Sequence, residues 1–220
     1  MADRILIVDD HPICCEAVAM AARRALPGVA VDQVGTLHLA ERATRAFPTY
    51  RFVVLDLMLP DALGFSGLLR LQQLIPRVPI AIISSVEDAD VAARALHLGA
   101  AAFLAKALSF ADLSAALTRL AAGERQAAPI NDAAGSALRD LRERLSTLTT
   151  SQLRVVMALR AGQLNKQIAH DLGLGEATVK THLAAAFRKL GVVNRTQAVV
   201  LVQTLDVLPY TILAKGAALA

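Results

Sequence analysis

Five polar side chains stand at the ends of short apolar runs in the first half of the sequence. Asp9 and Asp10 end the first run, Asp56 ends the third, Ser84 the fourth and Lys106 the fifth. If the runs are parallel strands, these side chains meet at the sheet edge where doubly wound folds bind their ligands. Three neighbouring carboxylates repel one another unless a cation joins them, and oxygen ligands favour Mg²⁺. The residues therefore predict a magnesium site at this edge.

Such a site could carry phosphoryl chemistry. A carboxylate beside Mg²⁺ can act as a nucleophile toward a phosphoryl group, as aspartyl-phosphate chemistry requires. The metal and the Lys106 ammonium would neutralise charge on the phosphoryl oxygens, and the Ser84 hydroxyl would bind one of them. Each residue alone could be an ordinary turn former or helix cap. Five suitable residues at the ends of four strands favour a common site.

The elements that must position these side chains are short strands alternating with helices. Apolar runs bounded by turn residues predict strands at 4–9, 29–34, 52–56, 79–84 and 101–106. Their continuous apolar character is typical of strands buried on both faces of a parallel sheet. Apolar residues at three- and four-residue spacings predict helices at 12–26, 37–47, 65–75, 88–98 and 109–121. We therefore expect an α/β fold, a doubly wound five-stranded parallel sheet of the flavodoxin-like kind.

The chain changes character after this predicted sheet. Gly, Pro, Asn and Asp break the periodicity over 123–136, which indicates a linker, and helical spacing returns at 137–148. Thr149 and Gln152 form a capping box at the start of the next helix. Further helices are expected at 165–172, capped by Asn165, and at 176–190 and 196–205. The expected divisions are a first domain, a partly helical linker and a small all-helical domain: 1–122, 123–147 and 148–220.

Charge is divided unevenly between these parts. The net charge is +4, of which the first 122 residues contribute −1, the linker zero and the last 73 residues +5. Such asymmetry indicates a polyanion-binding part joined to a near-neutral part. Two adjacent cysteines, Cys14 and Cys15, exclude a disulfide scaffold and favour a reducing compartment. Because no uncharged 18-residue stretch or signal peptide is present, we expect a cytoplasmic protein without a membrane partner.

The predicted helix over 176–190 is amphipathic in a way that suits DNA. Projection at 100° per residue puts Val179, Leu183 and Leu190 on the face that packs inward. The opposite face carries Ala177, Thr181, Ala184, Ala185 and Arg188, with Lys180 and Lys189 on its flanks. A polar strip between cations fits a helix laid in the major groove, with the flanking charges near phosphates. An ordinary amphipathic surface helix would show the same projection.

The first domain resembles the receiver domain of bacterial response regulators. The resemblance rests on VDDHP (8–12), LDLMLPDALG (55–64), IISS (82–85) and GAAAFLAK (99–106). It implies that Asp56 is the phosphoacceptor, served by a sensor histidine kinase. It also implies that Asp10 and the backbone carbonyl of Met58 bind Mg²⁺ directly, while Asp9 acts mainly through water. Phe103 matches an aromatic switch that moves inward after phosphorylation.

The last domain is similar to the LuxR-type helix-turn-helix. The matching motifs are NKQIA (165–169), ATVKTH (177–182), KLGV (189–192) and NRTQAV (194–199). With the receiver, they indicate the NarL/FixJ class, which implies a homodimer on double-stranded DNA when active. By the same resemblance, the residues that face base edges are Lys180, Thr181 and Ala184. Those that approach phosphates are Lys166, Thr178, Lys189 and Arg195.

Departures from the family pattern sharpen these expectations. Gln152 stands where the family usually has Glu, and Gly175 stands at the cap of the recognition helix where Ser is common. Ala184 replaces the long polar side chain of some relatives, so its base contact is lost or limited to a thymine methyl. We therefore expect direct readout to rest on Lys180 and Thr181, with DNA shape adding more.

Two other functions fit parts of the pattern. An aspartyl-phosphate enzyme such as a phosphatase would need an acid two residues after Asp56 to protonate its leaving group. Position 58 is Met, so we expect a regulator and not an enzyme. A regulator whose receiver signals by protein contact, without phosphorylation, remains an alternative that the residues leave open.

Overall fold

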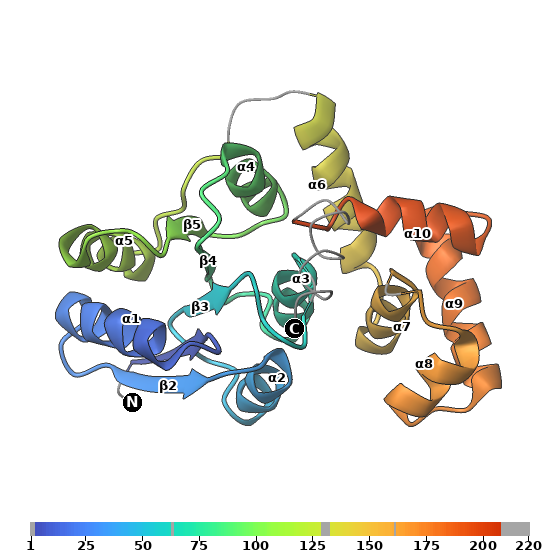
Figure 1. Ribbon diagram of the computed structural model, residues 1–220, viewed down its shortest axis with the longest axis horizontal. Coiled ribbons are helices and arrows are strands. Elements are labelled where there is room, and N and C mark those ends of the chain that lie inside the picture. The colour runs from blue at the N-terminus through green and yellow to red at the C-terminus, as the bar shows by residue number, and fades with distance from the viewer. Residues whose placement is uncertain (1–2, 63, 129–132, 161, 208–220) are drawn as a thin grey trace, which may run out of the picture. The chain divides into compact units, whose positions relative to one another are not determined.

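The computed structural model describes residues 3–62, 64–128, 133–160 and 162–207. The chain divides into two compact units, 1–139 and 140–220. The first holds a parallel sheet covered by helices, and the regular structure described in the second is all helical (Figure 1). This confirms the expected fold class. The domain limits at 122 and 147 remain predictions.

A five-stranded parallel sheet forms the centre of the first unit. Its strands are β1 (Arg4–Val8), β2 (Ala30–Val34), β3 (Val53–Asp56), β4 (Ile80–Ser84) and β5 (Ala102–Ala105). They lie in the order β2-β1-β3-β4-β5, and Leu55 of β3 pairs with Val8 on one side and Ile82 on the other. Strands β3 and β4 are buried along their whole length, which explains their continuous apolar sequences. Because the strand order reverses beside β1, the carboxyl ends of β1 and β3 form the switch point of the sheet.

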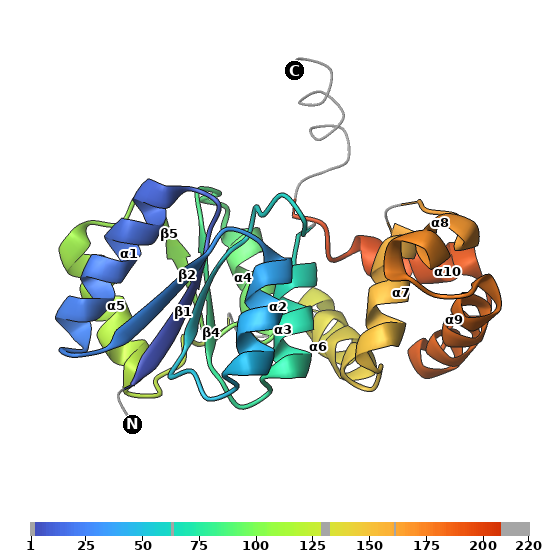
Figure 2. The same cartoon turned by 90° about the horizontal axis from the view of Figure 1, so that it is seen from below.

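Helices cover both faces of this sheet. Figure 2 shows α1 (Pro12–Ala25) and α5 (Phe110–Ala121) on one face. The opposite face carries α2 (Leu37–Ala46), α3 (Ser66–Leu74) and α4 (Ala89–His97). Ile5, Ile7 and Val54 pack under α1 and α5 in one apolar cluster. Side-chain caps fix the starts of three helices, because Thr36, Asp88 and Ser109 accept backbone N–H groups of the first turns of α2, α4 and α5.

Five further helices follow α5 in the described part of the chain. They are α6 (Ala133–Ser146), α7 (Thr150–Arg160), α8 (Asn165–Leu172), α9 (Glu176–Leu190) and α10 (Arg195–Gln203). The border between the two units falls within α6. Leu141, Leu145 and Leu148 are buried, and Leu138 is half-buried. Helices α7 to α10 share an apolar cluster that includes Val155, Ile168, Val179, Leu183 and Ala198.

The starts of α7 and α8 can be compared with the caps expected from the sequence. The capping box is confirmed, since Gln152 Oε1 accepts the Thr149 N–H at 3.1 Å and Thr149 Oγ1 accepts the Gln152 N–H at 3.3 Å. The expectation for Asn165 is wrong, because Leu164 is the N-cap residue of α8. Gln167 Oε1 accepts the amide N–H of Leu164 at 2.7 Å. The Asn165 side chain therefore has no part in this cap.

Some sequence expectations reach beyond the described residues. Part of the predicted linker (129–132) and the end of the last domain (208–220) lie outside them. Among the helices that the structure describes, none combines the length and the apolar character needed to cross a membrane.

Candidate functional site

The parallel sheet brings the predicted acidic residues together. Asp9 directly follows β1, and Asp56 is the last residue of the neighbouring β3. Both are 3 % exposed. Lys106, which follows the edge strand β5, extends its ammonium to within 2.7 Å of Asp9 Oδ2 and 2.9 Å of Asp56 Oδ2. One cation therefore bridges two buried carboxylates from neighbouring strands.

The lysine stays charged in this setting. Burial by itself lowers the pKa of Lys106, but hydrogen bonds and charge attraction from Asp9 and Asp56 outweigh it, so the pKa is raised. A protonated Lys106 supplies one positive charge against two buried carboxylates. The pocket therefore keeps an excess of negative charge that a further cation can neutralise.

The same pocket offers ligand atoms suited to a divalent cation. Ligand atoms of Asp9, Asp10, His11 and Asp56 lie within 4.8 Å of one another. Oδ1 of Asp56 is buried and has no hydrogen-bond partner among the described residues. A buried carboxylate oxygen without a partner is costly unless a ligand completes it. The carboxylates fit Mg²⁺, which prefers oxygen ligands.

His11, which follows Asp10 in the chain, is a further neighbour of the site. Its amide N–H donates to Asp9 Oδ1 at 2.9 Å, and its Nδ1 lies 2.9 Å from Asp10 Oδ1 and 3.2 Å from Asp9 Oδ1. The ring therefore contacts both carboxylates of the acid pair. The signal in the sequence was its position directly after Asp10.

Two other predicted members of the site, Met58 and Ser84, lie just after β3 and at the end of β4. Met58 is 39 % exposed in the loop that leaves β3, and its side chain has no metal-binding group. Ser84 ends β4 and is completely buried, and its Oγ accepts the Val86 N–H at 3.0 Å. Because the hydroxyl oxygen acts as the acceptor there, its own O–H is available to a ligand.

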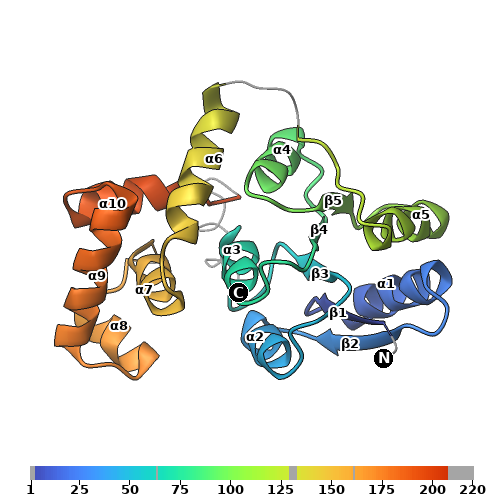
Figure 3. The same cartoon turned by 180° about the vertical axis from the view of Figure 1, so that it is seen from behind.

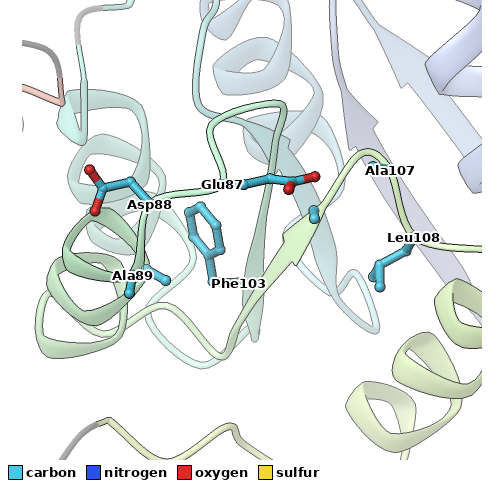
Figure 4. A pocket seen from close by; sticks show the side chains of 8 residues that line it. Glu87, Asp88, Ala89, Phe103, Ala107 and Leu108 are labelled. Atoms are coloured by element: carbon cyan, nitrogen blue, oxygen red, sulfur yellow. The ribbon is translucent and has the colours of Figure 1, made fainter.

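Phe103 lines an open pocket beside the site. It is half-buried in β5, and the pocket of about 380 Å³ lies between the start of α4 and the segment after β5. Figure 4 shows the Phe103 ring near Asp88 and Ala89, with Leu108 on the far side. The aromatic ring therefore has open space around it at the junction of α4 and β5.

The predicted recognition residues lie on the solvent-exposed side of α9. Thr178, Lys180, Thr181, Ala184 and Arg188 are all exposed. Thr181 Oγ1 donates to the Ala177 carbonyl oxygen at 3.0 Å, and the Lys180 ammonium lies 3.2 Å from Glu176 Oε1. Gly175 caps the helix in an extended conformation, as expected. This face can approach a groove without unpacking the core.

Two of the expected phosphate-binding cations have partners within the second unit. The Lys189 ammonium donates to the Thr147 carbonyl oxygen at 2.8 Å and to Gln152 Oε1 at 2.9 Å. Arg195 donates to Asn165 Oδ1 at 3.4 Å and to the Gln163 carbonyl oxygen. These contacts tie α9 to the start of α7 and α10 to the start of α8. Sequence reasoning missed them, and the capping role of Gln152 was a signal for the Lys189 contact alone.

Two other cations of this surface lack such partners among the described residues. Lys166 and Arg188 are exposed, and their side chains make no hydrogen bond or ion pair within the described part of the chain. They stand on α8 and α9, the two helices joined by the short turn at Gly173.

Each unit of the chain matches a known protein family. Residues 5–118 match the family model of the response regulator receiver domain, and residues 146–202 match that of the bacterial regulatory proteins of the luxR family. The glycerol metabolism activator of Pseudomonas putida is 32% identical, over 94% of this chain and 98% of its own length. The nitrate/nitrite response regulator NarL of Escherichia coli is 31% identical, over 89% of this chain and 93% of its own length.

A solved structure shows the same fold. The response regulator RcsB in complex with DNA superposes with a TM-score of 0.51 at 19% identity, covering 92% of this chain and 98% of its own. At this identity the likeness concerns the fold alone.

Proposed function

Because the chain belongs to the NarL/FixJ class of DNA-binding response regulators, we propose that a sensor histidine kinase phosphorylates it on Asp56 to control transcription. The observation that carries this proposal is the burial of the Asp56 carboxylate together with the contacts of its two oxygens. It is 3 % exposed, one oxygen contacts Lys106 and the other has no partner among the described residues. The free oxygen is the atom that acts as nucleophile.

Phosphoryl transfer then follows from the chain's own groups. Asp56 Oδ1 attacks the phosphorus of the kinase phosphohistidine, the P–N bond breaks, and its electron pair stays on the imidazole nitrogen. Lys106, held charged by its carboxylate partners, neutralises charge on the phosphoryl oxygens. Mg²⁺, when bound, would supply the remaining positive charge. Its direct ligands would be Asp10, Asp56 and the Met58 carbonyl, and Asp9 would act mainly through water.

Two side chains, Ser84 and Phe103, would then transmit the effect of phosphorylation to α4 and β5. Ser84 would donate its free hydroxyl hydrogen to a phosphoryl oxygen, which draws the end of β4 toward the site. Phe103 would turn into the space that this movement opens, and α4 and β5 would shift with it. The open pocket around Phe103 supports this step, because the ring can move without displacing a packed core. The shift would favour a DNA-binding homodimer by moving a population between two states.

The second unit would place α9 in the major groove. Lys180, Thr181 and Ala184 would face base edges. The groups proposed for phosphates are Lys166, Thr178, Arg188, Lys189 and Arg195. Lys166 and Arg188 have the strongest support, because their charges have no partner within the described residues. An enzyme is disfavoured, because Met58 cannot protonate a leaving group.

Mass spectrometry tests the phosphoacceptor directly. The protein is incubated with Mg²⁺ and acetyl phosphate and weighed beside the Asp56→Asn variant. We expect one added phosphoryl group on the wild type and none on the variant, because the amide is not a nucleophile. Asp61→Asn is the matched control, since Asp61 binds the α2 backbone outside the pocket and should leave the added mass unchanged. Added mass that survives Asp56→Asn, or no added mass at all, contradicts the proposal.

A further inference from the structure

The free edge of β5 is covered by the chain's own segment after α5. Strand β5 is the last strand of the sheet, so one of its sides has no neighbouring strand. Such edges expose backbone groups that proteins normally cover. The Gln126 N–H donates to the Ala101 carbonyl oxygen at 2.8 Å, and Gln126 Oε1 accepts the Phe103 N–H at 2.9 Å. One residue therefore binds the strand on both sides of Ala102, including the amide of the aromatic switch residue.

The chain is brought back to this edge by a fixed turn. Gly123 has a φ of 84°, a left-handed conformation that favours glycine. The N–H groups of Gly123 and Glu124 bind the carbonyl oxygens of Leu120 and Arg119, each at 3.0 Å. Arg51 donates to the Ala121 carbonyl oxygen from Nε at 3.1 Å and Nη2 at 2.6 Å. Figure 3 shows the segment leaving α5 and passing beside β5.

A second attachment joins the start of α6 to α4. His97, near the end of α4, is 6 % exposed. A Cβ added at Gly135 would lie 2.5 Å from His97 Nε2, so only glycine allows this approach without a shift. Arg139 Nη1 lies 3.1 Å from His97 Nδ1. These residues all belong to the first unit, and the chain continues from them into the second.

Both attachments fall on the two elements that flank the Phe103 pocket. Asp88, Ala89 and Ala92 line that pocket from the start of α4, and Phe103 lines it from β5. The segment that leads to the DNA-binding unit is thus bound to the parts of the receiver that would shift on phosphorylation.

We propose that Gln126, with Gly135 against His97, forms a latch that holds the linker on α4 and β5 and restrains DNA binding by the unphosphorylated protein. The proposal rests on the proposed function, since the latch matters only if the second unit binds DNA. Displacement of β5 carries the Phe103 amide away from Gln126 and releases the linker. Gln126 is a positioning residue, which touches neither the phosphoacceptor nor DNA.

The experiment uses the full-length unphosphorylated protein with Gln126→Ala. Only the acceptor for the Phe103 N–H is lost, so NMR should show faster hydrogen exchange at that amide. The same variant should bind DNA roughly two- to tenfold more tightly, as expected for the loss of one hydrogen bond that favours the restrained state. Gln126→Glu keeps an acceptor oxygen and should behave like the wild type. Ala127→Ser, a neutral change at the next exposed position, is the matched control.

The possible outcomes distinguish a failure of the latch proposal from a failure of the phosphorylation proposal. Gly135→Ala should release the second attachment and also tighten DNA binding, and every variant should still gain one phosphoryl group from acetyl phosphate. Unchanged exchange at Phe103 in Gln126→Ala would show that the bond does not exist. Faster exchange with unchanged DNA affinity would show that the contact does not restrain the second unit. Because these measurements use unphosphorylated protein, they decide the latch even if Asp56 accepts no phosphoryl group.

Discussion

At the scale of single residues, Lys106 sets the electrostatic balance of the phosphoacceptor pocket. Its ammonium lies 2.7 Å from Asp9 and 2.9 Å from Asp56, both buried. Lys106→Met leaves these two carboxylates without a cation, so we expect the free energy of unfolding at pH 7 to fall by about 3 kcal/mol. Since the pKa of Lys106 is raised above 10.5, its contribution is complete below that pH and is lost as the pH rises through the folded-state pKa.

Urea unfolding at several Mg²⁺ concentrations measures this effect. A divalent cation bound by the carboxylates replaces the missing charge, so Mg²⁺ should stabilise Lys106→Met more than the wild type. Lys166→Met, at an exposed lysine without a partner in the described chain, is the control and should change little. Equal stabilisation of the wild type and Lys106→Met by Mg²⁺ would mean that the ion binds elsewhere.

At the scale of elements, a buried ion pair joins α2 to α3. Glu41 is 2 % exposed, and its Oε1 accepts from Arg70 Nε at 2.7 Å and Nη2 at 2.6 Å. Arg45 contributes a longer contact of 3.6 Å. Arg70→Met should lower the free energy of unfolding by about 3 kcal/mol, because the buried carboxylate loses its main partner.

A double variant separates the cost of an unpaired charge from the worth of the pair. Glu41→Leu combined with Arg70→Met removes both charges and should recover most of the stability, as for other buried pairs replaced by apolar residues. Thermal or urea unfolding of the two single variants and the double variant gives the coupling energy. Additive losses would show that α2 and α3 are held together by apolar packing alone.

Sequence patterns predicted the elements better than the contacts between them. The strands and the helices that cover the sheet lie within one or two residues of the expected ranges, because apolar runs and caps act locally. The acidic cluster was predictable because parallel strands bring their carboxyl ends to one edge. The pair Glu41–Arg70 and the contact of Gln126 with Phe103 join residues 29 and 23 positions apart. No periodic pattern records such pairs, so only the fold reveals them.

At the scale of the whole molecule, charge is concentrated where DNA is proposed to bind. The first 122 residues carry a net charge of −1 and the last 73 carry +5. Phosphate contacts release counterions, so the logarithm of the DNA-binding constant should fall steeply with the logarithm of salt concentration. A titration of the full-length protein at several salt concentrations measures the slope, and a flat dependence would contradict a DNA-binding surface on the second unit.

Single variants measure how much each cation contributes to the slope of this salt dependence. Lys166→Ala and Arg188→Ala should each reduce its magnitude by about 0.9 per bound subunit and leave the unfolding temperature unchanged, because both side chains are free of partners in the described chain. Lys189→Ala should instead lower the unfolding temperature, because its ammonium joins α9 to Thr147 and Gln152. If Lys189→Ala reduced the slope without affecting stability, Lys189 would act at a phosphate and its internal bonds would carry little of the fold.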